Sequence, residues 1–168
     1  MSIYGTELVN DYGVKKLIRI GTCGAMQKDI QIRDIILAQA VSSDSNLTEK
    51  IFYGNNYAPP IADFPLLMKA FQQAQGKKGN VFVGNIYNSD EFYRETLDRL
   101  HKFMEFGVLG VEMESTALYT LAAKYGVKAL SILTVGSQLL TNESLTHEES
   151  EKSFFDMVDI ALQTIIDE

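Results

Sequence analysis

Two stretches of the chain decide the prediction of its fold: Ile18-Arg19-Ile20-Gly21-Thr22-Cys23-Gly24-Ala25 and Gly110-Val111-Glu112-Met113-Glu114-Ser115. In each stretch, an apolar run typical of a strand ends in polar or charged groups. The first offers a guanidinium, a hydroxyl and glycine-flanked amides, which together can hold an anion. The second offers two carboxylates, which can accept hydrogen bonds from the hydroxyls of a sugar. An anion site and a diol site in one crevice indicate a ligand that combines phosphate with a ribosyl group.

Strand and helix patterns alternate along the rest of the chain. Apolar runs predict strands over residues 15–20, 34–40, 80–86, 108–111 and 128–135. Amphipathic patterns predict helices over residues 2–12, 63–75, 91–106 and 114–125, and a last helix that the capping box Thr146-His147-Glu148-Glu149 opens. The polar stretch 42–60 is predicted to be a long loop, a feature that is more often functional than idle.

The alternation predicts an α/β fold with a mixed, mainly parallel sheet that is flanked by helices on both faces. In such sheets, ligands bind outside the carboxyl ends of the strands. Polar groups follow four of the predicted strands, at residues 21–24, 87–93, 112–114 and 136–138. We therefore expect these groups to share one crevice. The chain has no internal repeat or linker, which predicts a single domain over residues 1–168.

Composition narrows the class of protein. The chain has 168 residues, 46% of them hydrophobic and 22% charged, as is ordinary for a soluble globular domain. The net charge of −7 argues against nucleic-acid or anionic-membrane partners, which basic patches bind. A single cysteine, Cys23, excludes an internal disulfide framework and favours a cytoplasmic protein. No signal segment or membrane span is predicted.

Each candidate site residue has a structural alternative. Arg19 lies between two isoleucines, and a buried guanidinium there needs either an anionic ligand or a carboxylate such as Glu114. Glutamates are also favoured at a helix N-terminus. This alternative explains the presence of one glutamate well, but it explains the presence of both Glu112 and Glu114 less well. Phe92 could stack on a flat base or, with Tyr93, belong to an ordinary aromatic pair of the core.

The remaining reactive residue types carry little signal. Cys23 has no histidine beside it, so it is predicted to be a packing residue and not a nucleophile. His101 and His147 lie in helical contexts without a metal-ligand spacing, so no metal site is predicted.

Taken together, these segments resemble the bacterial purine nucleoside phosphorylases of the hexameric type, within the nucleoside phosphorylase superfamily. The resemblance rests on residues 17–24, 61–64, 83–86, 89–93, 107–115 and 128–130, which run in the family's order. It implies the three-layer phosphorylase fold and cleavage of purine (deoxy)ribonucleosides by phosphate, which gives free base and (deoxy)ribose 1-phosphate. It also implies a homo-oligomer, in the family a hexamer built as a trimer of dimers. Inorganic phosphate is then the co-substrate, with no metal or organic cofactor.

The resemblance also implies roles for residues of the two stretches. The positions that match the family's site are Arg19 and Thr22 for phosphate, Met113 and Glu114 for ribose, and Phe92, Val111, Glu112, Cys23 and Gly24 for the base.

Three departures from the family pattern stand out. The family has more chain before the helix at residues 2–12, about a quarter to a third of a typical member. That part forms the first strands and supplies a glycine and an arginine to the phosphate. Ser137 stands where the family has the aspartate that protonates the leaving base, and Ser150 stands where an arginine assists that aspartate. A serine hydroxyl is a poor proton donor at neutral pH.

The chain is therefore predicted to be an N-terminally shortened purine nucleoside phosphorylase with little activity of its own. The alternative is a catalytically impaired homologue that binds nucleoside and phosphate or only assembles with other subunits. Hydrolysis by water is disfavoured because Arg19 marks an anion site. The choice among adenosine, inosine and guanosine stays open.

Overall fold

The computed structural model describes residues 1–53, 58–77, 79–93, 98–146, 148–149 and 154–166. The helices are α1 (Ser2–Asn10), α2 (Leu47–Phe52), α3 (Phe64–Gln73), α4 (Asp98–Glu105), α5 (Ser115–Tyr125) and α7 (Phe155–Ile166). The strands are β1 (Lys16–Ala25), β2 (Ile35–Ser43), β3 (Val81–Asn88), β4 (Gly110–Glu112), β5 (Lys128–Gln138) and β6 (Glu143–Ser144). None of the helices in these ranges is both long and apolar enough to cross a membrane.

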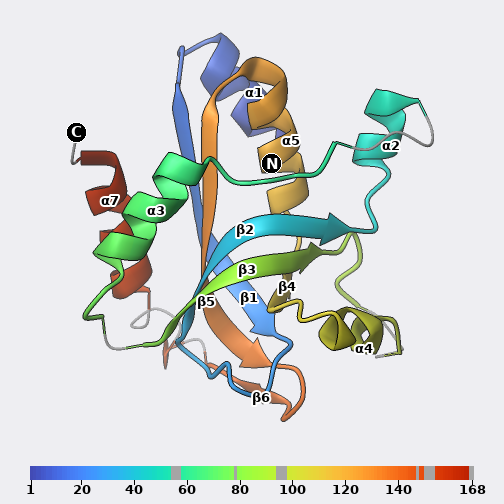
Figure 1. Cartoon of the computed structure of the whole chain (residues 1–168), viewed down its shortest axis with the longest axis vertical. Coiled ribbons are helices and arrows are strands. Elements are labelled where there is room, and N and C mark those ends of the chain that lie inside the picture. Colours follow the sequence, from blue (N-terminus) through green and yellow to red (C-terminus); the bar gives the residue numbers. More distant parts are fainter. Residues whose placement is uncertain (54–57, 78, 94–97, 147, 150–153, 167–168) are drawn as a thin grey trace.

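The strands form one mixed sheet that closes on itself. Their order is β1-β4-β3-β2-β5-β6, and β1 also pairs with β5, so five strands make a ring and β6 extends from β5 (Figure 1). The pairs β1–β5, β2–β3 and β3–β4 are parallel, whereas β1–β4, β2–β5 and β5–β6 are antiparallel. The expected mixed sheet is thus confirmed, but the expected layered sheet is corrected to one that closes into a barrel.

Two β-bulges accompany the closure. The register of β1 against β5 shifts between Cys23 and Gly24, where β1 begins to pair with β4 on its other edge while it continues along β5. The register of β2 against β3 shifts between Ala38 and Ala40, where β2 leaves β5. Bulges bend a strand and increase its twist, which allows one strand to pair with different neighbours at its two ends.

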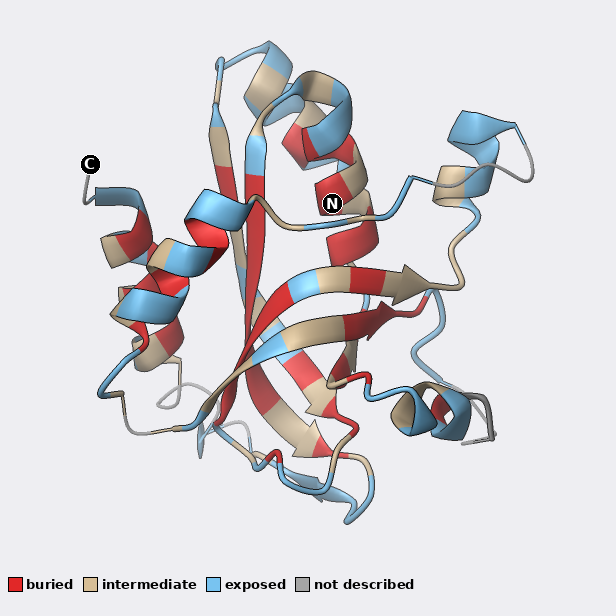
Figure 2. Ribbon diagram, viewed as in Figure 1, coloured by how far each residue is buried: buried red, intermediate tan, exposed pale blue. Residues whose placement is uncertain are grey.

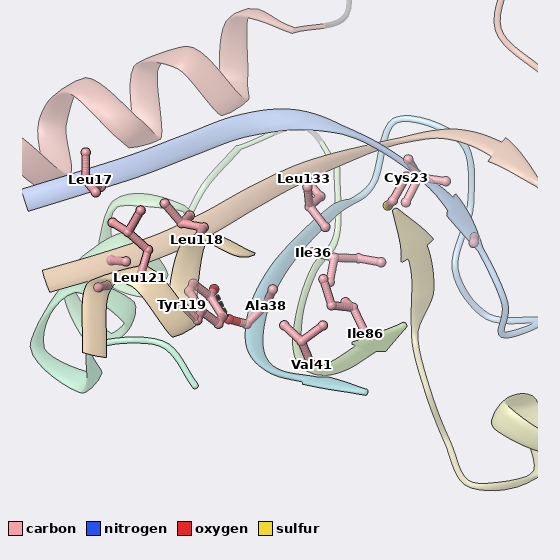
Figure 3. Packing of buried hydrophobic residues seen from close by; sticks show 14 of the residues in the cluster. Leu17, Cys23, Ile36, Ala38, Val41, Ile86, Leu118, Tyr119, Leu121 and Leu133 are labelled. Atoms are coloured by element: carbon pink, nitrogen blue, oxygen red, sulfur yellow. Dashed lines mark hydrogen bonds between the residues drawn. The ribbon is translucent and has the colours of Figure 1, made fainter. Parts of the chain in front are cut away.

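Helices pack on both sides of β5. On one side Leu118, Tyr119 and Leu121 of α5 belong to a core cluster with Ala129 and Leu133 of β5 (Figure 3). On the other side, Leu66, Leu67 and Ala70 of α3 and Met157 and Ile160 of α7 form a cluster with Leu130 and Ile132. Because alternate residues of a strand point to opposite faces, β5 is buried on both faces from Ala129 to Val135, and most of these residues are apolar. Figure 2 shows buried residues along most of its length.

The predicted helix signals are present in the structure. Asp63 accepts a hydrogen bond from the Leu66 amide at 3.0 Å and so caps α3. Gly126 ends α5 with φ of 64°. Thr146 and Glu149 exchange the reciprocal bonds of a capping box, at 3.0 Å from the Thr146 amide and 3.3 Å from the Glu149 amide.

Several element boundaries differ from the sequence prediction. The stretch predicted as a loop over 42–60 contains α2, and the described part of the helix predicted over 91–106 begins at Asp98. Strands β1 and β5 run on to Ala25 and Gln138, and β6 was not predicted. Glycine and polar residues at both strand ends hid this extension. The pairing of β1 with β5 continues there because backbone bonds hold the strands together whatever their side chains.

Candidate functional site

Three charged side chains from separate elements meet beside β1, where β4 ends and α5 begins. Arg19 of β1 donates a hydrogen bond from Nη2 to Oε2 of Glu114, the residue just before α5. The same Nη2 lies 3.5 Å from Oε2 of Glu112, the last residue of β4. The side chains of Arg19, Glu112 and Glu114 are 11%, 1% and 40% exposed. A guanidinium this deeply buried needs such partners, because an unpaired buried charge is costly.

Glu112 also acts as the cap of α5. Its carboxylate accepts hydrogen bonds from the amide of Glu114 at 2.9 Å and from that of Ser115 at 3.1 Å. Burial raises the pKa of Glu112, whereas Arg19 and the two amides act in the opposite direction. The helix-terminus interpretation therefore explains Glu112. The side chain of Glu114 makes no capping bond and turns to Arg19 instead.

Gly21 allows the guanidinium to lie over β1. A Cβ at this position would be 2.7 Å from Arg19 Nη1 and 2.9 Å from Cζ. Nη1 itself is buried and has no hydrogen-bond partner within the described residues. The cluster thus holds an N–H donor that neither glutamate uses, beside a backbone that a glycine leaves open.

Asn88, which the sequence analysis did not single out, ties this cluster to β3. Its Oδ1 accepts a hydrogen bond from the amide of Thr116, in the first turn of α5, at 3.0 Å. The next residue, Ser89, donates its amide to the Glu112 carbonyl at 2.9 Å. The signal that could have found Asn88 is a polar residue directly after an apolar strand, at a strand end already marked as part of the crevice.

The other predicted phosphate residue, Thr22, does not join the cluster. It is exposed, and because it lies three residues from Arg19 on the same strand, its side chain emerges from the opposite face of β1. Of the predicted ribose residues, Glu114 lies in the cluster, and Met113 stands at the turn with 37% of its surface exposed.

Four of the five predicted base residues lie together where β1 meets β4, because Gly24 pairs with Val111 and each is followed or preceded in the chain by the next member, Cys23 or Glu112. Phe92 is the fifth: it is 74% exposed, and its ring meets that of Tyr93 edge-on, at 5.0 Å between ring centroids. Val111 packs partly buried against the small cluster under α4. Cys23 is buried, and burial raises the pKa of its thiol to about 12. This inert thiol agrees with its predicted packing role.

The position of the predicted proton donor lies at the end of β5. Ser137 pairs with Gly24 of β1, and a Cβ on Gly24 would be 3.1 Å from the Ser137 Oγ. Its neighbour Gln138 is buried and donates to the carbonyls of Gln27 and Ile30, at 2.8 and 2.9 Å. Ser150, predicted to act with Ser137, lies outside the described residues.

Comparison with known proteins identifies the class to which this barrel and its strand-end cluster belong. A family model described as the phosphorylase superfamily matches residues 1–168. A solved structure, described as a Plasmodium knowlesi homologue of the Plasmodium falciparum purine nucleoside phosphorylase, superposes with a TM-score of 0.81. It is 28% identical, and the match covers 97% of this chain but 65% of that one.

Curated bacterial relatives are more similar in sequence. The "purine nucleoside phosphorylase DeoD-type" of a Bacillus cereus strain is 51% identical over 166 residues, which cover 99% of this chain and 70% of the relative. The protein of the same name from Bacillus thuringiensis strain Al Hakam gives the same figures. The chain therefore belongs to the phosphorylase superfamily, among the DeoD-type purine nucleoside phosphorylases. The resemblance predicted from the sequence is confirmed.

Proposed function

We propose that the protein binds a purine nucleoside and inorganic phosphate beside the Arg19–Glu112–Glu114 cluster and cleaves the N-glycosidic bond by phosphorolysis at a low rate. The observation that carries this proposal is the buried guanidinium of Arg19, whose Nη1 has no partner within the described residues. Such a donor suits an anion, and Glu114, still 40% exposed, suits sugar hydroxyls. The names of the relatives supply the substrate class.

In the proposed reaction, a phosphate oxygen forms a bond to the anomeric carbon while the bond from that carbon to the purine nitrogen breaks. The bonding electrons leave with the base, which must take up a proton at a ring nitrogen. Arg19 and the amide of Thr22 would hold phosphate, Met113 and Glu114 the ribose, and Phe92 and Val111 the base. Holding the phosphate and the nucleoside in line accelerates the reaction, because it removes the entropy cost of bringing the two reactants together.

Ser137 sets the expected rate. The family's aspartate donates the proton at this position, and a serine hydroxyl does so poorly. Loss of a general acid costs about 10²–10⁴-fold in rate. Phosphate enters the proposal as the second substrate, and no metal or organic cofactor is involved.

The test is a chromatographic assay of inosine, adenosine and guanosine at high protein concentration, with and without phosphate. We expect base release that requires phosphate, at a turnover number about 100-fold or more below the enzyme median of about 10 s⁻¹. Release at the same rate without phosphate would contradict the proposal, because it would show hydrolysis.

A second candidate, a nucleoside-binding homologue without turnover, is favoured specifically by Ser137. Calorimetric titration of the same preparation with inosine in phosphate buffer separates the two. Saturable binding with no base release over a day supports the second candidate, and base release supports the first.

We also propose that the protein is a homo-oligomer, as the resemblance implies. Of the described strands, β4 covers the outer edge of β1 only at Gly24 and Ala25, and Ile20 on that strand is 44% exposed. Such an edge favours pairing with another chain. Light scattering at micromolar concentration should show a mass above that of the 18.8 kDa monomer, and a clean monomer would refute this proposal.

A further inference from the structure

A polar pocket reaches the first turn of α5 at Thr116. Its volume is about 310 Å³, at the lower end of small-molecule sites. Residues at the end of β2 and in α2 line it, and Figure 1 shows α2 beyond the end of β2. The residues that line it are Val41, Ser43, Asp44, Ser45, Asn46, Thr48, Glu49, Ala58, Pro59, Pro60 and Thr116. None of the residues proposed for the nucleoside or the phosphate is among them.

Thr116 gives the pocket an unused polar group. The residue is 1% exposed, and its Oγ1 has no hydrogen-bond partner within the described part of the chain. Its amide is already held by Asn88, so the backbone does not need the hydroxyl. A buried hydroxyl that loses its water without gaining a partner destabilises the fold. A ligand oxygen at the floor of the pocket would accept a hydrogen bond from this hydroxyl.

The charge of the lining selects the ligand. Asp44 and Glu49 contribute carboxylates, and no lysine, arginine or histidine is among the lining residues that the structure describes. Asp44 is held in place, because its Oδ1 accepts the amide of Asp90 at 2.9 Å. Anionic ligands are therefore excluded by charge, and an ammonium group is favoured.

The opposite wall is apolar. Val41, Ala58, Pro59 and Pro60 offer carbon surface against which a short alkyl chain can pack. A ligand that satisfies all three features carries an ammonium group at one end, an oxygen acceptor at the other and a few carbons between them.

We propose that this pocket is a binding site for a small amino alcohol, a site separate from the proposed nucleoside and phosphate site. The ammonium group is bound by the carboxylates of Asp44 and Glu49, the carbon chain packs on the two prolines, and the hydroxyl accepts from Thr116. The proposal does not depend on any catalytic activity.

The experiment uses three matched probes with the full chain at neutral pH: aminopropanol, propylamine and propanediol. Binding is followed by the shifts of backbone amide signals in NMR titrations up to about 100 mM, which covers the weak affinities expected for such small molecules. We expect saturable shifts at residues of the pocket with aminopropanol, and affinities lower by about 5-fold or more for each probe that lacks one group.

Two variants and one control locate the binding. Thr116→Val keeps the shape of the side chain and removes the hydroxyl, and should abolish the preference for aminopropanol over propylamine. Glu49→Gln changes an exposed carboxylate and should weaken both amines by about 5-fold while leaving propanediol unchanged. Glu7→Gln removes the same charge from the exposed surface of α1 and should change nothing. Asp44 is not substituted, because it also holds Asp90.

Three results would overturn the proposal. One is the absence of saturable shifts with aminopropanol in the parent. Another is equal binding of all three probes. The third is a Thr116→Val variant that binds aminopropanol as the parent does, which would mean that water alone satisfies the hydroxyl. Thermal melts of each variant show that it is folded, so that lost binding is not lost structure.

Discussion

The charged cluster beside β1 and the end of β5 differ in the chemistry that they offer. In the cluster, Arg19 lies between Glu112 and Glu114, and every member of the group has a charged partner. At the end of β5, Gly136 and Ser137 bring no charge, although Ser137 pairs directly with Gly24 of β1. If the proposed site is right, the comparison teaches that binding and proton donation are carried by separate parts of this fold. The network proposed to bind is joined to the start of α5, whereas the position proposed for the acid is a single side chain at a strand end.

Removing the guanidinium of Arg19 should disrupt the cluster with Glu112 and Glu114. Arg19→Ala leaves the buried carboxylate of Glu112 without its cation, and we expect a loss of about 3 kcal/mol in the free energy of unfolding. Phosphate binding should disappear with it. Urea unfolding measures the first effect and calorimetric titration with phosphate measures the second.

Arg33→Ala is the matched control for this variant. Arg33 is 57% exposed and pairs with Glu149, so its loss should cost less than about 1 kcal/mol. If Arg19→Ala binds phosphate as well as the parent, Arg19 is only a structural ion-pair partner.

Placing a carboxylic acid at position 137 should restore part of the proton donation that the phosphorolysis reaction needs. Ser137→Asp is expected to raise the phosphorolysis rate about 10-fold or more, because a carboxylic acid replaces a poor proton donor. Phosphate affinity should stay nearly unchanged, since the network around Arg19 is not altered. Ser144→Asp, an exposed position across from Ser137 on β6, provides the control and should leave the rate as it is. Equal rates for the two variants would mean that position 137 does not receive the leaving base.

A methyl group added at Gly21 tests whether the guanidinium of Arg19 packs against the backbone of β1. In Gly21→Ala the new Cβ meets Arg19 Nη1 at 2.7 Å, so the guanidinium must move away from its glutamates. We expect a loss of about 1 kcal/mol in unfolding free energy, with weaker phosphate binding. At Gly136 on β5 an added Cβ finds nothing nearer than 3.6 Å, so Gly136→Ala should be close to neutral. Equal stability losses for these two variants would show that the guanidinium is not packed on β1.

The smallest effect is expected from an ion pair far from both strand ends. Lys77 and Asp159 link the segment after α3 to α7, and the hydrogen bond and charge of Lys77 lower the pKa of Asp159 below its ordinary 3.8. A lowered carboxyl pKa stabilises the fold above pH 3.8, and this contribution is lost as the pH falls through the lowered value. Asp159→Asn should therefore lower the urea midpoint slightly at pH 7 and not at all at strongly acidic pH. A difference that grows as the pH falls would contradict the assignment.

The α/β class and most elements could be predicted because apolar runs and caps are local signals. Asp63 and Gly126 mark their helix ends by chemistry that needs no partner elsewhere in the chain. The closure of the barrel could not be predicted, because it depends on pairings between distant strands and on register shifts at Gly136 of β5 and Gln39 of β2 that leave no trace in composition.

Part of the candidate site could also be predicted from local signals in the sequence. Arg19 and the two glutamates stand out as charges beside apolar strands, so their meeting could be anticipated. The Arg19–Glu114 ion pair was one of the two alternatives considered from the sequence, but which of the two glutamates caps α5 was left open, and the structure assigns that part to Glu112. The resemblance implied that Thr22 binds phosphate with Arg19, and the sequence, in which the strand was predicted to end at Ile20, could not show how the two side chains are oriented. The continuation of β1 to Ala25 puts the two side chains on opposite faces.

The long pairing of β1 with β5 also governs how the protein can be made. Lys16 lies opposite Lys128 and Thr22 opposite Thr134, so β1 finds its main partner only after more than a hundred further residues have been added. During synthesis the first strand leaves the ribosome early and then waits with its backbone groups unpaired until the last third of the chain emerges. Contacts so distant in sequence slow folding, and a waiting strand is exposed to other chains. We therefore expect the nascent chain to depend on chaperones and to gain protease resistance sharply once β5 has been released.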